Sequence, residues 1–413
     1  AIGEGELFFA LKGEQFDGNA FAGEALEKGA AYAIIDDVRY EKDRTIRVPD
    51  VLKALQQLAA HHRDQFDIPV FAITGSNGKT TTKELIGDVL ATEFNVHVTG
   101  GNLNNHIGLP LTLLDMPRIT DIAVLEMGAS APGEIAALCE IARPDHGMIT
   151  NVGKAHIEGF GSLEGVKRAK GELYEFLRKV DGVVFLPEDE PHLSEMAKGI
   201  ERIVRFASGE TPEEVNHNFR MSIEQIDPNV ILRIAAGDGS SISVESALFG
   251  MHNFKNIMAA VAVGRYFDVE PGKIAESIAS YRPTNHRSEW KTIGSNRFLM
   301  DCYNANPVSM RAAIDSFRSV HCDKKILILG DMLELGTISR EEHEAILDDL
   351  DIGEWSDIWL VGQEFSAIGQ RDHMRQFEDV HELKDWFRQR TFENTCFLLK
   401  GSRSIRLEGL VED

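Results

Sequence analysis

The sequence has few cysteines, few basic residues relative to acidic ones, and no long apolar run. Its four cysteines stand far apart without a C-x-x-C pair, at Cys139, Cys302, Cys322 and Cys396. This spacing indicates neither a zinc site nor a disulfide framework, so we expect reduced, mostly packed thiols, as in a cytosolic protein. The uncharged stretch 94–114 contains four Asn and three Gly residues. It is therefore not a membrane span, which needs about 18 consecutive apolar residues.

Basic residues are the scarcer charge. The 413 residues include 43 Lys and Arg against 66 Asp and Glu, which gives a formal net charge of −23. Such an acidic chain lacks the clustered cations that bind a nucleic-acid backbone, so nucleic acid is not an expected partner. A small basic pocket for an anionic metabolite remains compatible with this balance. The chain begins at Ala1 without a signal pattern, and we expect that its true start is missing.

The length predicts two to four domains. From Val70 onward, short β-branched runs alternate with amphipathic stretches, which is typical of βα units around a parallel sheet. Each predicted strand ends in a polar residue, where open α/β sheets place their ligands. The pattern predicts strands over 70–74, 122–126 and 147–151, and helices over 79–91, 132–142 and 163–177.

Two further changes of pattern divide the chain. The period approaches two over 219–248, which predicts a small antiparallel section, and it becomes helical again over 252–267. Residues 281–285 suit a linker because Pro283 restricts the residue before it. A second α/β pattern follows, with strands expected at 297–301, 325–330, 357–361 and 395–399. We therefore predict an α/β protein of three domains, over residues 1–66, 67–283 and 284–413.

The segment FAITGSNGKTTTKEL, residues 71–85, is the strongest local signal. A buried strand leads into Gly75-Ser76-Asn77-Gly78, and Lys79-Thr80 opens a helix. Glycines let backbone N–H groups approach phosphate oxygens, the lysine adds a point charge, and the Thr80 hydroxyl suits Mg²⁺. The pattern departs from the common phosphate loop because Ile73 stands where the first glycine would be. A plain strand–turn–helix connection is the alternative.

Two side chains could join a metal site near this loop. Glu126 closes the predicted strand 122–126, and His156 lies just past the next one. Both fall at the sheet edge that carries the loop, and Mg²⁺ prefers oxygen ligands. Each has a simpler interpretation, since a glutamate at a strand end is usually solvated and a lone histidine is usually a hydrogen-bonded surface or core group.

Several motifs together resemble the Mur ligase family of peptidoglycan synthesis. The ATP-site segments are TGSNGKTTT (74–82), LEMGAS (125–130), NVGKAH (151–156), RAKGELYEFL (168–177) and HNFKNIMAA (252–260). Other segments resemble the branch that joins D-alanyl-D-alanine to UDP-N-acetylmuramoyl-tripeptide: LFFALKGEQFDGNAF (7–21), TGGNLNNHIGLPLTLL (99–114), DCYNANPVSM (301–310), LGDMLELG (329–336) and KGSRS (400–404). The resemblance covers essentially the whole chain.

The resemblance implies roles at the phosphate end of an ATP site. Lys79, Thr81 and the loop backbone would hold phosphates, and Thr80 with Glu126 would hold one Mg²⁺. His156 would bind a second Mg²⁺, bridged by Lys170, a lysine that is carbamylated in this family. Carbamylation converts a cation into an anionic oxygen ligand that suits a hard metal. By sequence alone, Lys170 would be an exposed helix lysine.

The resemblance also implies residues for the nucleoside and for the acceptor substrates. Asn253 and Asn256 would contact the adenine base. The simpler interpretation of both residues is helix capping. Arg287 of the third domain would reach the γ-phosphate. Asp301 would bind the ribose hydroxyls. Three further side chains would lie close to the nucleotide, namely Tyr303, Asn304 and Asn306. The wall facing the muramoyl–peptide would include Asn102, Asn104 and Asn105, and the terminal peptide end would meet Lys400, Ser402 and Arg403.

The implied protein is a cytoplasmic, bacterial, ATP-dependent amide ligase that acts as a monomer. Its fold would comprise a small uridine-binding α/β domain, a parallel-sheet ATPase domain with the antiparallel section, and a Rossmann-like C-terminal domain. The family's uridine signature would lie before Ala1, which again suggests truncation. Cys302 stands where serine is common in the family, and we interpret it as a packing substitution.

Three alternatives are considered. The first is another amide ligase of the same fold, such as the enzyme that adds the third stem residue or a folylpolyglutamate synthetase-like enzyme; the former usually carries an Asp-Asn-Pro-Arg segment, which this sequence lacks. The second is a nucleotide-regulated binding protein, which would not require the combination of Glu126, His156 and Lys170. The third is a phosphate-loop hydrolase or kinase, which the C-terminal motifs disfavour.

Overall fold

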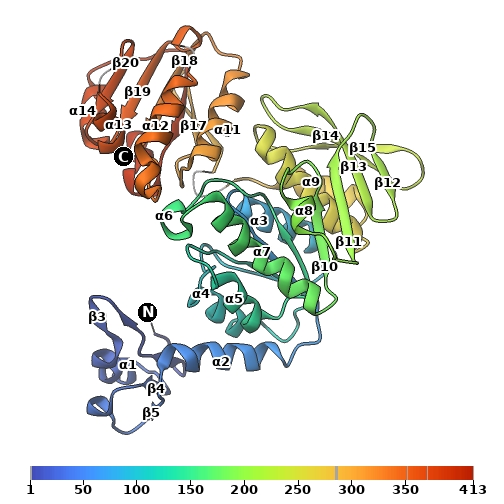
Figure 1. Ribbon diagram of the computed structural model, residues 1–413, viewed down its shortest axis with the longest axis vertical. Helices are drawn as coiled ribbons and strands as arrows, with labels where there is room; N and C mark the ends of the chain where they lie inside the picture. The colour runs from blue at the N-terminus through green and yellow to red at the C-terminus, as the bar shows by residue number, and fades with distance from the viewer. Residues whose placement is uncertain (1, 284–286, 351, 370, 413) are drawn as a thin grey trace.

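The computed structural model describes residues 2–283, 287–350, 352–369 and 371–412. The chain forms three α/β bodies in sequence order (Figure 1). The predicted linker over 281–285 and the predicted start of the third domain at residue 284 lie partly outside the described residues. The domain limits that we place at 66/67 and 283/284 therefore stay a prediction.

The N-terminal body is a small parallel sheet joined to the rest by a helix. The sheet order is β1-β4-β5, and a short hairpin of β2 and β3 stands beside it. Asp50 caps the connecting helix α2 by accepting from Lys53 N at 2.9 Å, and α2 bridges to the central body in Figure 1. The elements are β1 (Leu7–Phe9), β2 (Lys12–Gly13), β3 (Phe16–Asp17), η1 (Gly18–Phe21), α1 (Ala22–Glu27), β4 (Tyr32–Ile35), η2 (Val38–Tyr40), β5 (Thr45–Arg47) and α2 (Val51–Arg63).

The central body is built on a long mixed sheet of order β15-β14-β13-β11-β10-β9-β6-β8-β7. Its strands are β6 (Val70–Thr74), β7 (Val96–Val98), β8 (Ile122–Glu126), β9 (His146–Ile149), β10 (Val183–Pro187), β11 (Ile203–Ser208), β12 (Glu213–Val215), β13 (Asn218–Gln225), β14 (Ile231–Ala235) and β15 (Ser241–Glu245). Its helices are α3 (Lys79–Leu90), α4 (Gly108–Leu114), α5 (Glu134–Ala142), α6 (Ile157–Phe160), α7 (Leu163–Lys179), α8 (Leu193–Met196), α9 (Met251–Tyr266) and α10 (Pro271–Ser280).

The predicted antiparallel section is confirmed. Strands β13, β14 and β15 pair antiparallel, whereas β13 pairs parallel with β11. The section is therefore an extension of the central sheet. The strands β6 and β8 begin and end where the sequence predicted, and β9 and α5 differ by about two residues. Outside the N-terminal body, the sequence analysis missed the strands β7, β10, β11, β12, β16 and β20.

The C-terminal body has the sheet order β16-β17-β21-β18-β19-β20, parallel except for the β16–β17 pair. Its strands are β16 (Glu289–Ile293), β17 (Asn296–Met300), β18 (Lys324–Gly330), β19 (Asp357–Val361), β20 (Met374–Phe377) and β21 (Thr395–Lys400). Its helices are α11 (Pro307–Arg318), η3 (Gly336–Ile338), α12 (Ser339–Asp348), η4 (Ile352–Glu354), α13 (Gln363–Ile368), α14 (Val380–Arg388), η5 (Arg403–Ile405) and η6 (Leu407–Leu410).

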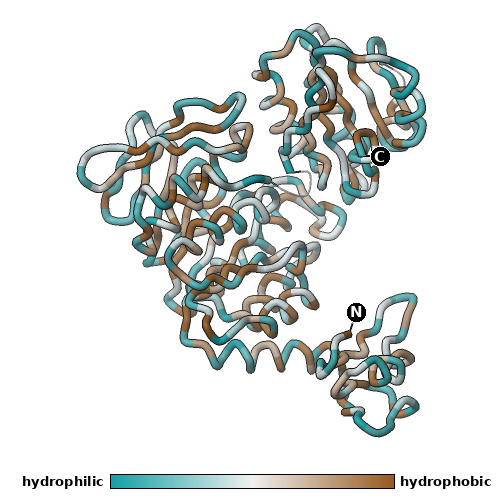
Figure 2. Tube along the Cα trace, turned by 180° about the vertical axis from the view of Figure 1, so that it is seen from behind, coloured by the Kyte–Doolittle hydropathy of each residue, from teal (hydrophilic) through white to brown (hydrophobic). Residues whose placement is uncertain are grey.

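The cores lie on both faces of these sheets. Along β6, Phe71 and Ile73 pack into one apolar cluster, whereas Val70 and Ala72 pack into another on the opposite face. Continuous apolar runs are typical of parallel strands because helices cover both sides. The hydropathy trace in Figure 2 shows apolar segments running through the interior of the larger bodies. These buried strands hold the loops at their carboxyl ends in fixed positions.

The prediction of reduced thiols is wrong for one pair. A disulfide joins Cys322 and Cys396, which are 74 residues apart in sequence. Strands β18 and β21 are neighbours, and their register places Lys325 opposite Cys396, so Cys322 just before β18 lies within bonding reach. Sequence spacing cannot reveal such a pairing. Cys139 and Cys302 are free and buried, which agrees with the prediction.

Candidate active site

A cavity of about 720 Å³ lies between the central and C-terminal bodies, at the carboxyl ends of their parallel strands. Both bodies contribute to its lining. The sequence-predicted residues that line it are Ser76, Asn77, Gly78, Lys79, Thr80, Thr81, Asn102, Asn104, Glu126, His156, Asn253, Asn256, Arg287, Asp301, Tyr303, Asn304, Asn306 and Lys400. The topology thus brings together residues that are more than 300 positions apart in the chain.

Two glycines of the phosphate loop are required by the backbone and its neighbours. At Gly75, where φ is +148°, a Cβ atom would lie 1.9 Å from Thr150 Oγ1. At Gly78, where φ is +80°, it would lie 2.6 Å from Asn256 Oδ1. Gly78 also forms the N-cap of α3, so the helix begins at Lys79 with its amide groups facing the cavity end of the loop. The plain-turn alternative explains none of this crowding.

The segment after β9 braces the phosphate loop. Asn77 N donates to Asn151 Oδ1 at 3.0 Å, and Thr150 Oγ1 donates to the Asn77 carbonyl at 2.6 Å. Ser76 Oγ donates to the Gly153 carbonyl at 3.1 Å and accepts from Gly153 N at 2.9 Å. These contacts fix the loop in one conformation, so its amide groups are organised before a ligand arrives.

Lys79 curls over the loop from the first turn of α3. Its Nζ donates to the Gly75 carbonyl at 2.7 Å, with the Ser76 carbonyl at 3.4 Å. The enclosure of the ammonium lowers the pKa of Lys79, the carboxylate of Glu126 opposes that shift, and the guanidinium of Arg287 adds to it. Lys79 therefore shares an electrostatic environment with a carboxylate and with a cation from the C-terminal body.

Glu126 is buried, and its two oxygens differ. Oε1 accepts from Asn104 Nδ2 at 2.7 Å, whereas Oε2 has no hydrogen-bond partner among the described residues and lies 3.8 Å from Lys83 Nζ. Lys83 itself donates to the Thr99 carbonyl at 2.7 Å, and burial lowers its pKa. Glu126 is therefore held by one oxygen and has a second, dry oxygen available, which suits a metal ligand.

His156 and Lys170 lie around the short helix α6. His156 Nδ1 contacts Glu334 Oε2 of the C-terminal body at 2.6 Å, and no described residue hydrogen-bonds to its Nε2. Lys170 is buried, with Nζ 3.4 Å from the Ala129 carbonyl and 5.3 Å from the centre of the Phe160 ring. Burial, and next the charge of Lys79, lowers the pKa of Lys170 to about 7. Lys170 is thus not the exposed lysine that its position in sequence alone suggested.

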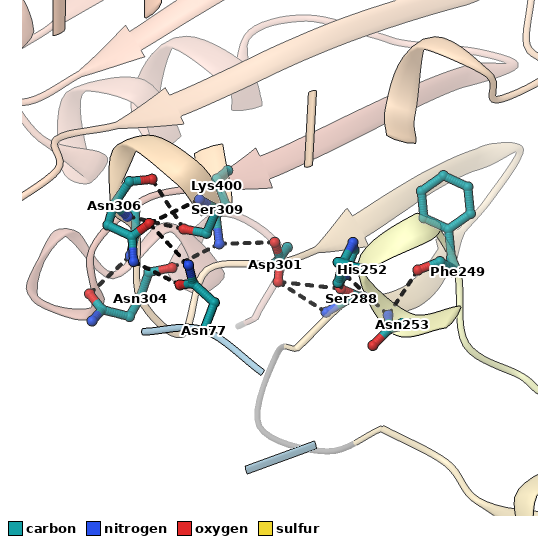
Figure 3. Close-up of polar contacts among 11 residues, drawn as sticks. Asn77, Phe249, His252, Asn253, Ser288, Asp301, Asn304, Asn306, Ser309 and Lys400 are labelled. Carbon is teal, nitrogen blue, oxygen red and sulfur yellow. Dashed lines mark hydrogen bonds and ion pairs between the residues drawn. The ribbon is translucent and has the colours of Figure 1, made fainter. Parts of the chain in front are cut away.

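A continuous polar chain runs through the nucleoside end of the cavity (Figure 3). Asn253 accepts from Asn256 Nδ2 at 3.0 Å and donates to the Phe249 carbonyl at 2.8 Å. His252 Nε2 lies 3.1 Å from Asn253 Nδ2 and 2.9 Å from Ser288 Oγ. Ser288 belongs to the C-terminal body, so the chain crosses from one body to the other beside the predicted adenine residues.

Arg287 and Tyr303 form the opposite wall. The Arg287 guanidinium lies 3.6 Å from the centre of the Tyr303 ring, and its buried Nε has no hydrogen-bond partner among the described residues. Asn306 caps α11 by accepting from Ser309 N at 2.9 Å, and its Nδ2 donates to Asn77 Oδ1 of the phosphate loop at 2.7 Å. The cap of a C-terminal helix therefore touches the phosphate loop directly.

Some predicted residues do not line the described cavity. The Asn105 side chain instead accepts from Ile107 N at 3.1 Å and from Gly108 N at 2.9 Å, at the turn that leads into α4. Ser402 Oγ accepts from Leu333 N at 2.9 Å, and Arg403 lies 4.8 Å from the Tyr303 ring centre, behind the wall. The remaining residues outside the described lining are Gly75 and Lys170. Among the described residues, no three or more His, Cys, Asp or Glu side chains gather into a metal cluster.

The site residues that escaped the sequence analysis include Lys83, His252 and Ser288, as well as Thr150, Asn151 and Glu334. Lys83 looked like one more polar residue on an amphipathic helix, and Ser288 follows the predicted linker. His252 stands next to Asn253 in a motif that was noted, and its adjacency to that asparagine was the available signal.

None of the described helices is long and apolar enough to cross a membrane.

Comparison with protein families matches each body of the chain to a model. The Mur ligase family catalytic domain matches residues 1–63, the Mur ligase middle domain matches residues 73–264, and the Mur ligase glutamate ligase domain matches residues 286–403. These matches cover the three bodies in order.

Similar proteins and structures extend over nearly the full chain. A UDP-N-acetylmuramoyl-tripeptide–D-alanyl-D-alanine ligase of Bacillus subtilis (strain 168) is 37% identical over 99% of this chain and 90% of its own length. That of Escherichia coli (strain K12) is 32% identical over 98% and 90%.

Two solved structures share the fold. MurF from Acinetobacter baumannii has a TM-score of 0.86 at 31% identity, covering 99% of this chain and 90% of its own. MurF ligase from Thermotoga maritima in complex with ADP has a TM-score of 0.86 at 28% identity, covering 99% and 94%. The predicted three-domain α/β architecture is thereby confirmed, and the chain belongs to the Mur ligase family.

Proposed function

We propose that the cavity joins D-alanyl-D-alanine to UDP-N-acetylmuramoyl-tripeptide at the expense of ATP, which yields a pentapeptide precursor of peptidoglycan. One observation carries this assignment. The phosphate loop of the central body and the residues Arg287 and Asp301 of the C-terminal body line a single cavity, in a chain that is 37% identical to a ligase of that name over 99% of its length. The MurF relative that holds ADP supports nucleotide binding here.

The chemistry proceeds in two substitutions. The terminal carboxylate of the tripeptide attacks the γ-phosphorus of ATP, which breaks the bond to the β-phosphate oxygen and releases ADP. The amine of D-alanyl-D-alanine then attacks the resulting acyl phosphate, and inorganic phosphate and a proton leave as the amide forms. Positioning and electrostatic stabilisation do most of this work, because charge is spread over the transferring phosphoryl oxygens.

This chain's residues supply that positioning. The loop amides and the Lys79 ammonium would face the phosphates, and Arg287 stands on the opposite wall with an Nε that has no hydrogen-bond partner among the described residues. The acyl phosphate must be shielded from water, which would hydrolyse it. The contact of Asn306 with Asn77 links the two walls of the cavity.

The residues present fit Mg²⁺. Among the described residues, Glu126 Oε2 is buried without a hydrogen-bond partner, 3.8 Å from Lys83 Nζ, and Thr80 lines the same cavity. His156, whose Nε2 makes no hydrogen bond to a described residue, and Lys170 would hold a second ion. Bound Mg²⁺ would neutralise charge on the phosphate oxygens. Asn104 holds Glu126 in place for this role through its 2.7 Å hydrogen bond.

Lys170 is suited to carbamylation. Only a neutral amine adds CO₂, and burial lowers the pKa of Lys170 to about 7. The carbamate would offer two anionic oxygens to the metal. Its formation would also replace a buried cation beside Lys79 with an anion.

The remaining assignments are adenine at Asn253 and Asn256, ribose at Asp301, and the muramoyl–peptide at Asn102 and Asn104. The enzyme would act as a monomer in the bacterial cytoplasm, with uridine bound by the N-terminal body.

Release of ADP separates this function from its alternatives. We expect the purified protein to release ADP from ATP with UDP-N-acetylmuramoyl-tripeptide only when D-alanyl-D-alanine is also supplied, and we expect Lys79→Ala to abolish that release. An exposed-lysine variant, Lys324→Ala, serves as the matched control because Lys324 lies at the outer end of β18. ADP release that is independent of the dipeptide, or near-normal turnover of Lys79→Ala, would contradict the assignment.

A further inference from the structure

The ammonium of Lys400 already makes an ion pair and a hydrogen bond inside the cavity. Its Nζ lies 2.9 Å from Asp301 Oδ2 and donates to the Asn304 carbonyl at 2.8 Å, and only 4% of its side chain is exposed. The sequence suggested that Lys400 meets the terminal peptide of the acceptor. To do so its buried ammonium would have to leave both partners and remove the cation from the half-buried Asp301 carboxylate, which is unfavourable.

The sheet itself builds the Lys400–Asp301 pair. Strands β17 and β21 are parallel neighbours, and their register pairs Met300 with Leu399. Asp301 and Lys400 are the next residues on each strand, so they stand side by side at the carboxyl edge, where such sheets bind ligands. The backbone therefore sets their spacing before any substrate enters.

Asp301 is held from both sides. Lys400 occupies Oδ2, while Ser288 N lies 3.2 Å and Ser288 Oγ 3.4 Å from Oδ1. Ser288 Oγ in turn contacts His252 Nε2 at 2.9 Å, next to Asn253 on the central body. Figure 3 shows this chain passing from Lys400 through Asp301 and Ser288 to the predicted adenine residue. Oδ1 already accepts from two donors of Ser288, whereas Oδ2 accepts only from Lys400 among the described residues and keeps a lone pair that could accept from a hydroxyl group.

We propose that Lys400 is a positioning residue for the nucleotide and does not contact the dipeptide. It fixes the Asp301 carboxylate in the orientation in which Oδ2 accepts a hydrogen bond from a ribose hydroxyl. The inference rests on the proposed function, because it takes ATP as the occupant of the cavity. It changes the assigned substrate of Lys400 from the peptide to the nucleoside.

Calorimetric binding of ADP and of 2′,3′-dideoxy-ADP tests this role. The wild-type protein should bind ADP about tenfold more tightly than the dideoxy analogue, since a hydrogen bond to a charged acceptor has about that effect. In Lys400→Met, ADP should bind about tenfold more weakly while the analogue is nearly unaffected, so the ratio approaches one. The KM for ATP should rise, and the KM for D-alanyl-D-alanine should stay the same. Lys324→Met, an exposed lysine of the same sheet, is the matched control.

Two further variants guard against a folding defect. Lys400→Gln keeps a donor toward Asn304 but removes the charge, and Ser288→Ala removes the hydroxyl on the other side of Asp301; both should lower the ADP-to-dideoxy ratio. An unchanged ratio in a folded Lys400 variant, or a raised KM for the dipeptide alone, would overturn the inference. Failure of the wild-type protein to release ADP with the dipeptide would instead overturn the proposed function and leave the binding ratio measurable.

Discussion

Lys170 provides the sharpest link between a buried environment and activity. The side chain is only 1% exposed, its Nζ has the Ala129 carbonyl at 3.4 Å, and the Phe160 ring centre is 5.3 Å away. Burial disfavours the ammonium form, and the nearby Lys79 charge disfavours it further, so the pKa falls from 10.5 to about 7. The neutral amine therefore predominates above pH 7 and is lost as the pH falls below that value.

The magnitude follows from this pKa. At pH 8, about 90% of Lys170 would be neutral, compared with roughly 0.4% of a lysine with an ordinary pKa near 10.4. Its reactive fraction is thus about 200-fold larger than that of a surface lysine. At pH 6 the neutral fraction falls to about 9%, a tenfold loss relative to pH 8. If the carbamate supplies the second metal position, activity should depend on CO₂ in the same window.

The assay begins with enzyme held at pH 6 in CO₂-free buffer and then transferred to pH 8. We expect low initial ligase activity that recovers when bicarbonate is added, and a carbamate signal in ¹³C NMR when the bicarbonate is ¹³C-labelled. Lys170→Met should show neither recovery nor signal, whereas Lys324→Met should behave as wild type. Full activity without CO₂ after this treatment, or a near-normal rate for Lys170→Met, would refute the reasoning.

Two further predictions concern the C-terminal body. Asn306→Ala should lower the free energy of unfolding by about 1 kcal/mol, because the helix cap is lost, whereas Asn306→Asp should keep the cap and lose only the 2.7 Å donation to Asn77. Denaturant melts measure the loss of the cap, and the KM for ATP measures the loss of the contact with the loop. An unchanged KM for ATP in Asn306→Asp would show that this contact does not contribute to ATP binding. Phe317→Ala, at a fully buried site in the C-terminal core, should cost about 3–5 kcal/mol in a denaturant melt, and a loss below about 1 kcal/mol would contradict close packing there.

Much of the central body was predictable because its signals are local. The strands β6 and β8 are uninterrupted apolar runs, and their limits matched the sequence. The phosphate loop was recognisable because its glycines, lysine and threonine are contiguous. The missed strands β10 and β11 lie in a stretch where charged residues flank short runs, and β20 has buried residues only at its ends. For these strands, pairing with neighbours outweighs the local pattern.

The site was only partly predictable because contact partners are not local. Sequence resemblance suggested most of the residues that line the cavity, but it could not tell which of them hold substrate and which hold one another. Asn105 accepts from the backbone of the turn before α4, and Lys400 pairs with Asp301. The Cys322–Cys396 bond is a similar case, since it depends on the order of strands in a sheet and not on spacing.

The sequence by itself determined the scarcity of basic residues, the phosphate loop, the alternating α/β pattern and the family resemblance, because each is written in neighbouring residues. The tertiary structure alone decided that Lys170 is buried, that Glu126 Oε2 is buried without a hydrogen-bond partner among the described residues, and that the cap of α11 touches the phosphate loop. Burial and contact depend on which strands and helices become neighbours. A pKa near 7 for a lysine therefore arises from folding, although the lysine itself is visible in the sequence.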